Sequence, residues 1–468
     1  MLDSDLLPKK RTMKKLKYIS LTMVAAAVMF SCNKKLDVLP QNNITPEQIQ
    51  TSGDVIAVML GGYGILQNPN AYGERYQFVA DLLASQDQID FIGTFTNYAD
   101  IQSKTQIENN SIASGIWINS YSLINAMNTV IDKIDIVDEA DRDAIEAEAK
   151  FMRRIAYFEL INFYAQPYSA GNTTAANSGV PLILEPTYTY DSTIKPSRAT
   201  TEEIYQQVIS DFTAAEAALP ESASAGRATT YSASAFLARV YMQMGNYQLA
   251  AEKADAVISS GGYGLVQNYS EAFNGDGYSD EDIFGILQSS QSNAGTTNNG
   301  LPTFFAPRPV GRGDAQVNAN YFSYFGVNDQ RGYFFTDGVS IGGFGGTYTD
   351  KYSVLYKTIP VIRVAEMYLT RGEANLRKGG APVGGVDPDD DLNAVRSARG
   401  IGNINNASGD DFVEERFREL AFEGDRVWTL KRLQLDIDGL PYNDPMLVLP
   451  IPQRELDVNK NLQQNAGY

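Results

Sequence analysis

Three glutamates near the C-terminus have the residue type and spacing for catalysis: Glu415, Glu419 and Glu423. They are four residues apart, so a helix over this segment would place them on one face, about 6 Å apart per turn. Two carboxylates about 5–10 Å apart could form the catalytic pair of a glycosidase. Three arginines interleave with them: Arg416, Arg418 and Arg426. These arginines favour a salt-bridged structural helix over a catalytic pair.

A possible serine nucleophile occurs at residues 338–342, where GVSIG matches the GxSxG elbow around Ser340. The 468 residues contain no histidine and one cysteine. This composition excludes Ser-His-Asp and Cys-His catalysis, HExxH zinc sites and haem held by histidine. It also excludes an intrachain disulfide and a cysteine-rich metal site. We therefore expect Ser340 to lie in a loop.

Two other polar segments resemble ligand loops only in part. Residues 342–346 are rich in glycine but lack the lysine of a phosphate loop. Asn274, Asp276, Asp280 and Asp282 alternate as in a calcium loop, but the central glycine and the final glutamate are missing. We predict no cofactor and no metal. The net charge of −18 would repel a phosphate backbone and argues against nucleic-acid binding.

The elements that must position any site are mostly helical. Apolar residues recur every three or four positions over 145–163, which predicts one apolar helix face. Similar patterns predict helices at 46–66, 74–85, 114–134, 201–219, 232–244, 247–259, 361–377, 391–399 and 411–433. Only Gly245 and Asn246 separate 232–244 from 247–259, so these two helices must be antiparallel. Small residues at Ala235, Ala238 and Ala250 are typical of tetratricopeptide pairs. We predict a mainly α fold of tetratricopeptide-like helix pairs, an α-α superhelix.

Two long loop-rich stretches interrupt the helices. Residues 86–112 are polar with interleaved aromatics, and the insertion 263–360 is rich in Gly, Asn, Ser, Tyr and Phe. Both are too long for passive connectors. Loops on a rigid frame commonly carry binding sites, so we expect function here.

The N-terminus has the order of a secretory signal. Basic residues at 14–17 precede an uncharged apolar run at 18–30, then Ser31 and Cys32. The run is shorter than the roughly 20 residues that span a bilayer. It resembles a lipoprotein signal in which Cys32 becomes acylated, although residues 29–31 are a loose version of the usual box. We assign 1–31 to the signal, with Met13 as an alternative start, 32–45 to a lipidated tether and 46–468 to a single helical domain. The alternative is an ordinary signal peptide with an incidental cysteine.

An ordered set of motifs gives the chain a family resemblance. The motifs are FMRRIAYFEL at 151–160, PSR at 196–198, GRAT at 226–229, IRVAE at 362–366, LNAVR at 392–396, ERFRELAFEGDR at 415–426 and LPIP at 449–452. In this order, behind a lipoprotein signal, they resemble the SusD/RagB family of outer-membrane nutrient-binding lipoproteins. The resemblance covers nearly all of the chain after the signal.

The resemblance implies a helical scaffold of four tetratricopeptide-like pairs and a lipid-anchored position on the cell surface. It also implies a SusC-type TonB-dependent outer-membrane barrel as partner, to which the protein delivers a captured oligosaccharide. Family members are binders and not enzymes. Some members, of the RagB type, take peptides, so peptide capture for the same kind of transporter is the alternative. A helical-repeat adaptor without a small ligand is a more distant option.

Sugar recognition needs flat aromatic faces together with amide or charged groups for the hydroxyls. Trp117 and Trp428 lie in apolar or arginine-rich helical segments, and we expect both in the core. Tyr and Phe must therefore supply the faces. The candidate ligand-binding residues are Phe91, Phe95, Asn97 and Tyr98 in the first loop and Arg308, Arg312, Tyr321 and Tyr324 in the second. For each of them, loop packing or contact with the barrel is the competing interpretation.

Overall fold

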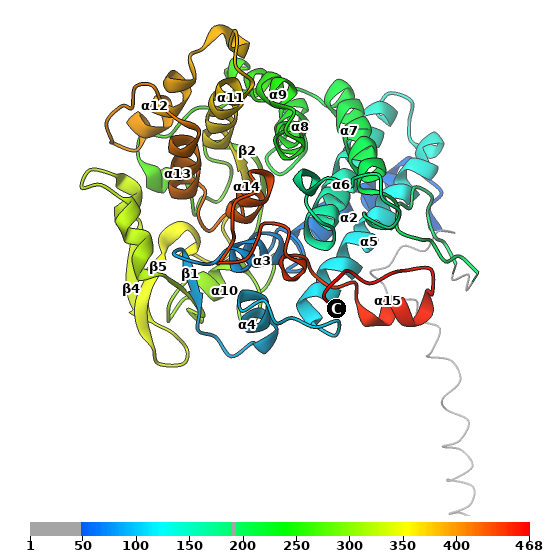
Figure 1. The fold of residues 1–468 in the computed structure, drawn as a ribbon. Coiled ribbons are helices and arrows are strands. Elements are labelled where there is room, and N and C mark those ends of the chain that lie inside the picture. The colour runs from blue at the N-terminus through cyan, green and yellow to red at the C-terminus, as the bar shows by residue number, and fades with distance from the viewer. Residues whose placement is uncertain (1–47, 190–192) are drawn as a thin grey trace, which may run out of the picture. The chain divides into compact units, whose positions relative to one another are not determined.

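The computed structural model describes residues 48–189 and 193–468. Cys32, the expected signal and the expected tether lie outside the described residues. The helices are α2 (Ser52–Gln67), α3 (Arg75–Leu83), α4 (Thr96–Gln102), α5 (Ser111–Asp132), α6 (Arg142–Tyr164), α7 (Thr201–Ala218), α8 (Thr230–Met244), α9 (Tyr247–Ser259), α10 (Leu301–Phe305), α11 (Val364–Lys378), α12 (Pro388–Ala398), α13 (Gly409–Glu419), α14 (Arg426–Arg432) and α15 (Gln453–Val458) (Figure 1). The strands are β1 (Ile89–Phe91), β2 (Asp282–Ile286), β3 (Ala315–Val317), β4 (Phe335–Val339), β5 (Gly345–Thr349) and β6 (Ile359–Arg363).

The predicted mainly α class with tetratricopeptide-like pairs is confirmed. Helices α5 to α9 contact one another in sequence order, and α11 continues the stack between α9 and α12. The predicted two-residue turn joins α8 and α9. Gly245 takes a left-handed conformation there with φ +72°, which suits glycine. Asn246 then caps α9 by accepting a hydrogen bond from the Leu249 backbone N–H at 3.3 Å. Among the described residues, none of the helices combines the length and apolar character needed to cross a bilayer.

The loop-rich insertion 263–360 contains most of the strands. Three two-stranded antiparallel sheets pair β1 with β3, β2 with β6, and β4 with β5. The prediction of a helix from 361 was wrong at its start, because Ile359–Arg363 forms β6 and lies opposite β2. α11 begins only at Val364.

The predicted helix 411–433 is also wrong as one element. α13 ends at Glu419 and α14 begins at Arg426. Between them Phe422 and Gly424 have φ values of +66° and +79°. A Cβ on Gly424 would lie 2.9 Å from the Cα of Gln77. The turn therefore requires glycine at position 424, which has no side chain and tolerates a positive φ. The turn directs the Glu423 carboxylate to Lys351 and Arg363, each at 2.7 Å.

A buried set of charges, here called the ion cluster, ties the insertion to the helices. Its members are Glu281, Arg331, Lys351, Arg363, Arg399, Glu415, Glu419 and Glu423. Glu415 and Glu419 are both fully buried and paired with arginines. The predicted salt-bridged role of these glutamates is confirmed, although Glu423 lies beyond the end of α13.

Candidate ligand-binding surface

The pairing of β1 with β3 brings the two predicted binding loops together. Phe91 lies opposite Ala315, and the Ile92 backbone N–H donates to the Asp314 carbonyl at 2.8 Å. The segment after β1 therefore runs beside the segment before β3, although more than 200 residues separate them in sequence.

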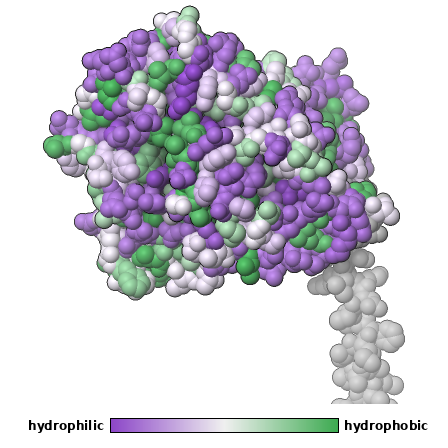
Figure 2. Space-filling model, viewed as in Figure 1, coloured by the Kyte–Doolittle hydropathy of each residue, from purple (hydrophilic) through white to green (hydrophobic). Residues whose placement is uncertain are grey.

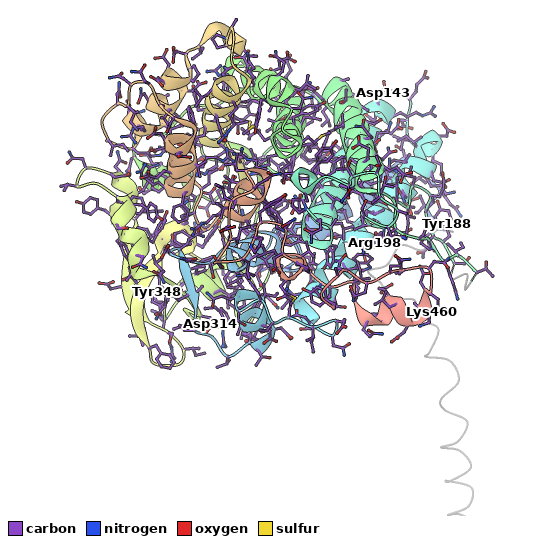
Figure 3. The ribbon with its side chains drawn as sticks, in the orientation of Figure 1. Asp143, Tyr188, Arg198, Asp314, Tyr348 and Lys460 are labelled. Carbon is purple, nitrogen blue, oxygen red and sulfur yellow. The ribbon has the colours of Figure 1, made fainter. Side chains whose placement is uncertain are left out.

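Phe95 and Arg312 meet where these segments run side by side. The Arg312 guanidinium carbon lies 4.7 Å from the centre of the Phe95 ring, a cation–π distance. Arg312 also donates from Nε to Asp314 Oδ2 at 2.6 Å and from Nη2 to Thr94 Oγ1 at 3.3 Å. Asp314 itself is buried, and a Cβ on its neighbour Gly313 would lie 3.0 Å from the ring of Tyr348, which Figure 3 labels together with Asp314. These contacts fix the orientation of Arg312, while its Nη1 has no acceptor among the described residues.

The tip of the β4–β5 hairpin completes this surface. The Ile341 backbone N–H donates to the Arg312 carbonyl at 2.6 Å, and the Arg308 N–H donates to the Val339 carbonyl at 3.0 Å. Three apolar side chains at the tip are about half exposed: Val339 at 47%, Ile341 at 46% and Phe344 at 59%. We call the combined set the hairpin surface: Phe95, Arg308, Arg312, Val339, Ile341 and Phe344.

Ser340 belongs to the turn at this tip and not to a nucleophile site. It is buried, and its Oγ accepts a hydrogen bond from the Phe344 backbone N–H at 3.0 Å. The predicted loop position of Ser340 is confirmed.

Three first-loop candidates lie beside the hairpin surface, with less exposure than expected. Tyr98 is only 2% exposed and donates its hydroxyl to Glu74, so the expectation that it offers an open ring is wrong. α4 turns Tyr98 inward, so that its ring centre lies 5.1 Å from that of Phe78 in α3 and 5.2 Å from that of Phe304 in α10. Phe91 is half-buried, with its ring centre 5.8 Å from that of Tyr98. Asn97 is half-buried and donates from Nδ2 to Ser111 Oγ at 2.7 Å.

The two tyrosines of the second loop lie elsewhere. Tyr321 is 1% exposed and donates its hydroxyl to the Phe417 carbonyl at 3.2 Å, so it is a core residue and the binding expectation is wrong for it. Tyr324 is half-buried at α13, with its ring centre 4.7 Å from that of Phe417. Trp117 is buried as predicted, whereas Trp428 is only partly buried.

Sequence reasoning missed Val339, Ile341 and Phe344 as surface residues. It interpreted residues 338–342 as a loop around Ser340 and residues 342–346 as a glycine-rich turn. The available signal was the set of large apolar side chains between glycines in an otherwise polar loop. Glycine neighbours cannot cover such side chains.

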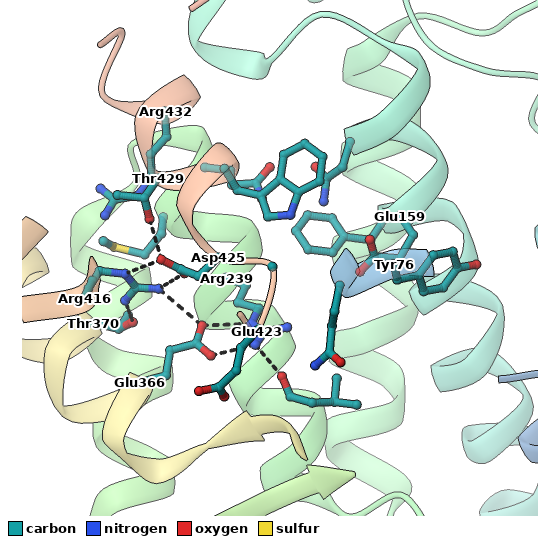
Figure 4. A pocket seen from close by; sticks show the side chains of 18 of the residues that line it. Tyr76, Glu159, Arg239, Glu366, Thr370, Arg416, Glu423, Asp425, Thr429 and Arg432 are labelled. Atoms are coloured by element: carbon teal, nitrogen blue, oxygen red, sulfur yellow. Dashed lines mark hydrogen bonds and ion pairs between the residues drawn. The ribbon is translucent and has the colours of Figure 1, made fainter. Parts of the chain in front are cut away.

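Apart from the hairpin surface, a pocket lies inside the helical part, between α3, α6, α8, α11 and α14 (Figure 4). Its charged groups are already paired: Arg239 with Glu366 at 2.6 Å, and Arg416 with Asp425. Glu159 on its wall accepts the Tyr72 hydroxyl at 2.7 Å, and burial raises the pKa of this carboxyl to about 7. The cavity of about 50 Å³ holds about two water molecules. We therefore do not place a ligand there.

Residues 48–189 and 193–468 contain no group of three or more Asp, Glu, Cys or His side chains that could hold a metal. In the segment that resembled a calcium loop, Asp276 pairs with Lys357 at 2.6 Å, and Asp282 accepts the Ser279 N–H at 2.7 Å. These two carboxylates therefore have protein partners.

Two family models match the chain. The model described as "Starch-binding associating with outer membrane" covers residues 35–242, and the model described as "SusD family" covers residues 323–438. Together they span well over half of the sequence. The hairpin surface draws on both matched segments and on the unmatched stretch between them.

Individual proteins are similar over most of the length. SusD-like protein P38 of Formosa agariphila is 24% identical over 97% of this chain and 100% of its own. SusD-like protein P25 of the same organism is 27% identical over 60% of this chain, and the alignment spans 56% of the P25 length. A crystal structure of a SusD superfamily protein from Bacteroides thetaiotaomicron superposes with a TM-score of 0.81 at 25% identity, over 89% of this chain and 99% of the other. With its helical stack and its motifs in family order, this chain belongs to the SusD/RagB family.

Proposed function

We propose that this protein captures oligosaccharides at the surface of the outer membrane and delivers them to a SusC-type TonB-dependent transporter. The description of the family model as starch-binding and outer-membrane-associated supports a glycan ligand and that location. The observation that carries the proposal is the junction of Phe95, Arg312 and the hairpin tip on a fold of this family.

The hairpin surface offers the two kinds of contact that a sugar needs. The half-exposed side chains of Ile341 and Phe344 can cover the apolar face of a pyranose ring. Arg308 is exposed and Arg312 has a free Nη1 donor, so both can bind hydroxyl oxygens. Phe91 and Asn97 border this surface and are proposed as secondary contacts.

The arrangement favours binding over hydrolysis. The carboxylates that could have formed a glycosidase pair, Glu415 and Glu419, are fully buried and paired with arginines. A general acid must reach the glycosidic oxygen, and these groups have no exposed oxygen to do so.

The test is a glycan array probed with the full chain, followed by calorimetric titration of the best ligand. Phe95→Ala and Arg312→Gln should each weaken binding by about tenfold or more, the effect of losing one stacked ring or one charged hydrogen bond. Tyr333→Ala is the matched control, because Tyr333 is an aromatic of the same insertion, 70% exposed, outside the hairpin surface. Equal binding by all three variants would remove the hairpin surface from the proposal. Binding of peptides and of no glycan would favour the RagB-type alternative.

The anchor and the partner have their own tests. We propose that Cys32 is acylated and tethers the domain, because a single lipidated terminus can hold a protein at a membrane without spanning it. Cys32→Ala should move the protein from the membrane fraction to the soluble fraction when no barrel is present. Co-expression with a SusC-type barrel should give a complex that co-purifies; its absence under conditions where both fold would contradict the delivery role.

A further inference from the structure

Another pocket, here called the groove, opens between α13 and α14, at the other end of the β4–β5 hairpin from the hairpin surface. Its volume is about 270 Å³, the share of about nine water molecules in the liquid. Tyr324 closes one side, and its neighbour Tyr321 packs against Phe335 at the base of the hairpin. The hairpin surface lies at the tip, so the two places are separate. Figure 2 shows hydrophobic residues gathered near the middle of the face on which α13 and α14 lie.

The wall of this groove is apolar and aromatic. Val413 and Phe417 come from α13 and Leu430 from α14, and Tyr324 stands edge-on to Phe417 at an interplanar angle of 83°. The Arg418 Nε donates to the Tyr324 carbonyl at 2.7 Å, which holds Tyr324 in place. Such a wall suits the apolar face of a ring with polar edges.

Three acids and two arginines line the groove, namely Asp410, Glu414, Asp425, Arg416 and Arg426, and two of these five groups are unpaired. Arg418 pairs with Glu414, and Arg416 pairs with Asp425. Asp410 is exposed and forms no ion pair or side-chain hydrogen bond within the described part of the chain.

The second unpaired charge is Arg426. Its guanidinium carbon lies 4.1 Å from the centre of the Phe417 ring, and its Nη1 donates to the Gln86 carbonyl. Its Nε and Nη2 have no acceptor in residues 48–189 and 193–468, and no carboxylate lies within ion-pair distance there. One free acceptor group and one free donor group therefore face the same apolar wall.

We propose that this groove is a second, independent binding site for one neutral sugar ring. Each hydroxyl of a neutral sugar both donates and accepts, so one ring can donate to Asp410 and accept from Arg426 while its apolar face covers Leu430 and Val413. A uronate or sulfated sugar would gain from Arg426 but meet the carboxylates of Asp410 and Glu414. The protein's net charge of −18 would repel it further. The inference rests on the proposed glycan function and extends it to a site outside the predicted loops.

The experiment measures hydrogen–deuterium exchange of the full chain with and without neutral methyl pyranosides of glucose, galactose, mannose and xylose. Galacturonic acid and a zwitterionic dipeptide serve as charged comparisons. At least one neutral pyranoside should protect α13 and α14. Asp410→Asn should lower the affinity for the sugar about tenfold, so that about ten times more sugar gives the same protection. This is the loss expected for one charge-assisted hydrogen bond. Because Asp410 is exposed, this variant should fold.

Two controls separate the sites. Asp390→Asn removes an exposed carboxylate from the first turn of the neighbouring helix α12 and should leave the protection unchanged. Phe95→Ala should weaken protection around the hairpin surface and leave that of α13 and α14 intact. Arg426→Gln should repeat the effect of Asp410→Asn.

The outcomes distinguish this inference from the proposed function. Protection confined to the hairpin surface and unaffected by Asp410→Asn would overturn the second site while leaving the glycan function standing. Protection of α13 and α14 by galacturonic acid or the dipeptide and by no neutral sugar would overturn the neutral-sugar assignment. If the glycan array and all pyranosides gave no binding, the proposed function and this inference would fail together.

Discussion

Replacing Glu419 by glutamine should strongly destabilise the protein, because Glu419 is the centre of the ion cluster. Its carboxylate accepts hydrogen bonds from Arg363 at 2.9 Å, from Arg399 at 2.9 and 3.0 Å, and from Arg331 at 3.1 Å. Glu419 is fully buried, so water cannot reach and solvate the arginines that lose their charged partner. Glutamine keeps the shape and one acceptor oxygen but leaves the buried arginines with too little negative charge.

The expected loss follows from that imbalance. Breaking a buried ion pair from one side costs about 3–5 kcal/mol. With an unfolding entropy of about 2.1 cal/mol/K per residue over residues 50–468, 1 kcal/mol shifts the melting temperature by about 1 °C. Glu419→Gln should therefore melt about 3–5 °C below the parent. Glu414→Gln is the matched control on the same helix, because Glu414 is 47% exposed and its pair with Arg418 contributes about 0.5 kcal/mol or less.

The pH dependence gives this prediction a second readout. Burial raises the pKa of Glu419, but Arg399 and Arg363 outweigh it and hold that pKa well below its usual range. The stabilisation from Glu419 is therefore present above the unfolded pKa of about 4.3 and is lost as the pH falls through the folded pKa. The gap between parent and Glu419→Gln should be full at pH 7 and narrow below about pH 4. Calorimetric melting curves at both pH values test this. If Glu419→Gln and Glu414→Gln melt together at pH 7, the ion cluster does not hold the insertion on the helices.

Three further results are expected. Tyr98→Ala and Tyr321→Ala should each lower the free energy of unfolding by about 3–5 kcal/mol, as buried aromatic truncations do, whereas Phe95→Ala should cost about 1 kcal/mol or less; equal losses in urea titrations would contradict the burial of the tyrosines. Burial raises the pKa of Glu74 to about 7, so the native state keeps a proton between about pH 4.5 and 7 that the unfolded chain releases, and stability falls as pH rises through that window. Glu74→Gln should flatten this fall in urea titrations at several pH values, and parallel curves would refute it. Ala250→Leu should overpack the fully buried face of α9 and cost about 1–3 kcal/mol; an unchanged thermal midpoint would contradict the α8–α9 contact.

Local sequence signals predicted the helix pairs well. The pair α8–α9 was predictable because only Gly245 and Asn246 connect the two helices. A connection of two residues makes the chain reverse direction, so the helices must be antiparallel. The break after Glu419 was not predictable in the same way, because the spacing of Glu415, Glu419 and Glu423 fits a continuous helix. The chain turns there because Glu423 pairs with Lys351 and Arg363, and Lys351 is 72 residues distant in sequence.

The candidate site was predictable in location but not in detail. Aromatic and arginine residues in both loops marked the right segments, and β1–β3 pairing brings Phe95 to Arg312. Composition could not separate Phe95 from Tyr98, because burial depends on how the two loops pack on each other. A partial signal existed for Tyr98, since Ile101 follows three residues later and both are buried on one face of α4.

The ion cluster offers a physical reason for such a costly core in a binding protein. Buried ion pairs give little net stability over a well-packed apolar core, so stability alone does not account for Glu281, Arg331 and Lys351 in the insertion. Apolar contacts tolerate sliding, whereas Arg363 and Arg399 each require carboxylates at fixed positions from both the insertion and α13. The insertion has short strands and long irregular stretches, and so has few backbone contacts to fix its register. We infer that the cluster fixes one position and orientation of the insertion on the helices. The hairpin surface and the contact of Tyr324 with Phe417 both depend on that position of the insertion. Glu419→Gln should therefore weaken ligand binding at both places under conditions where the helices are still folded.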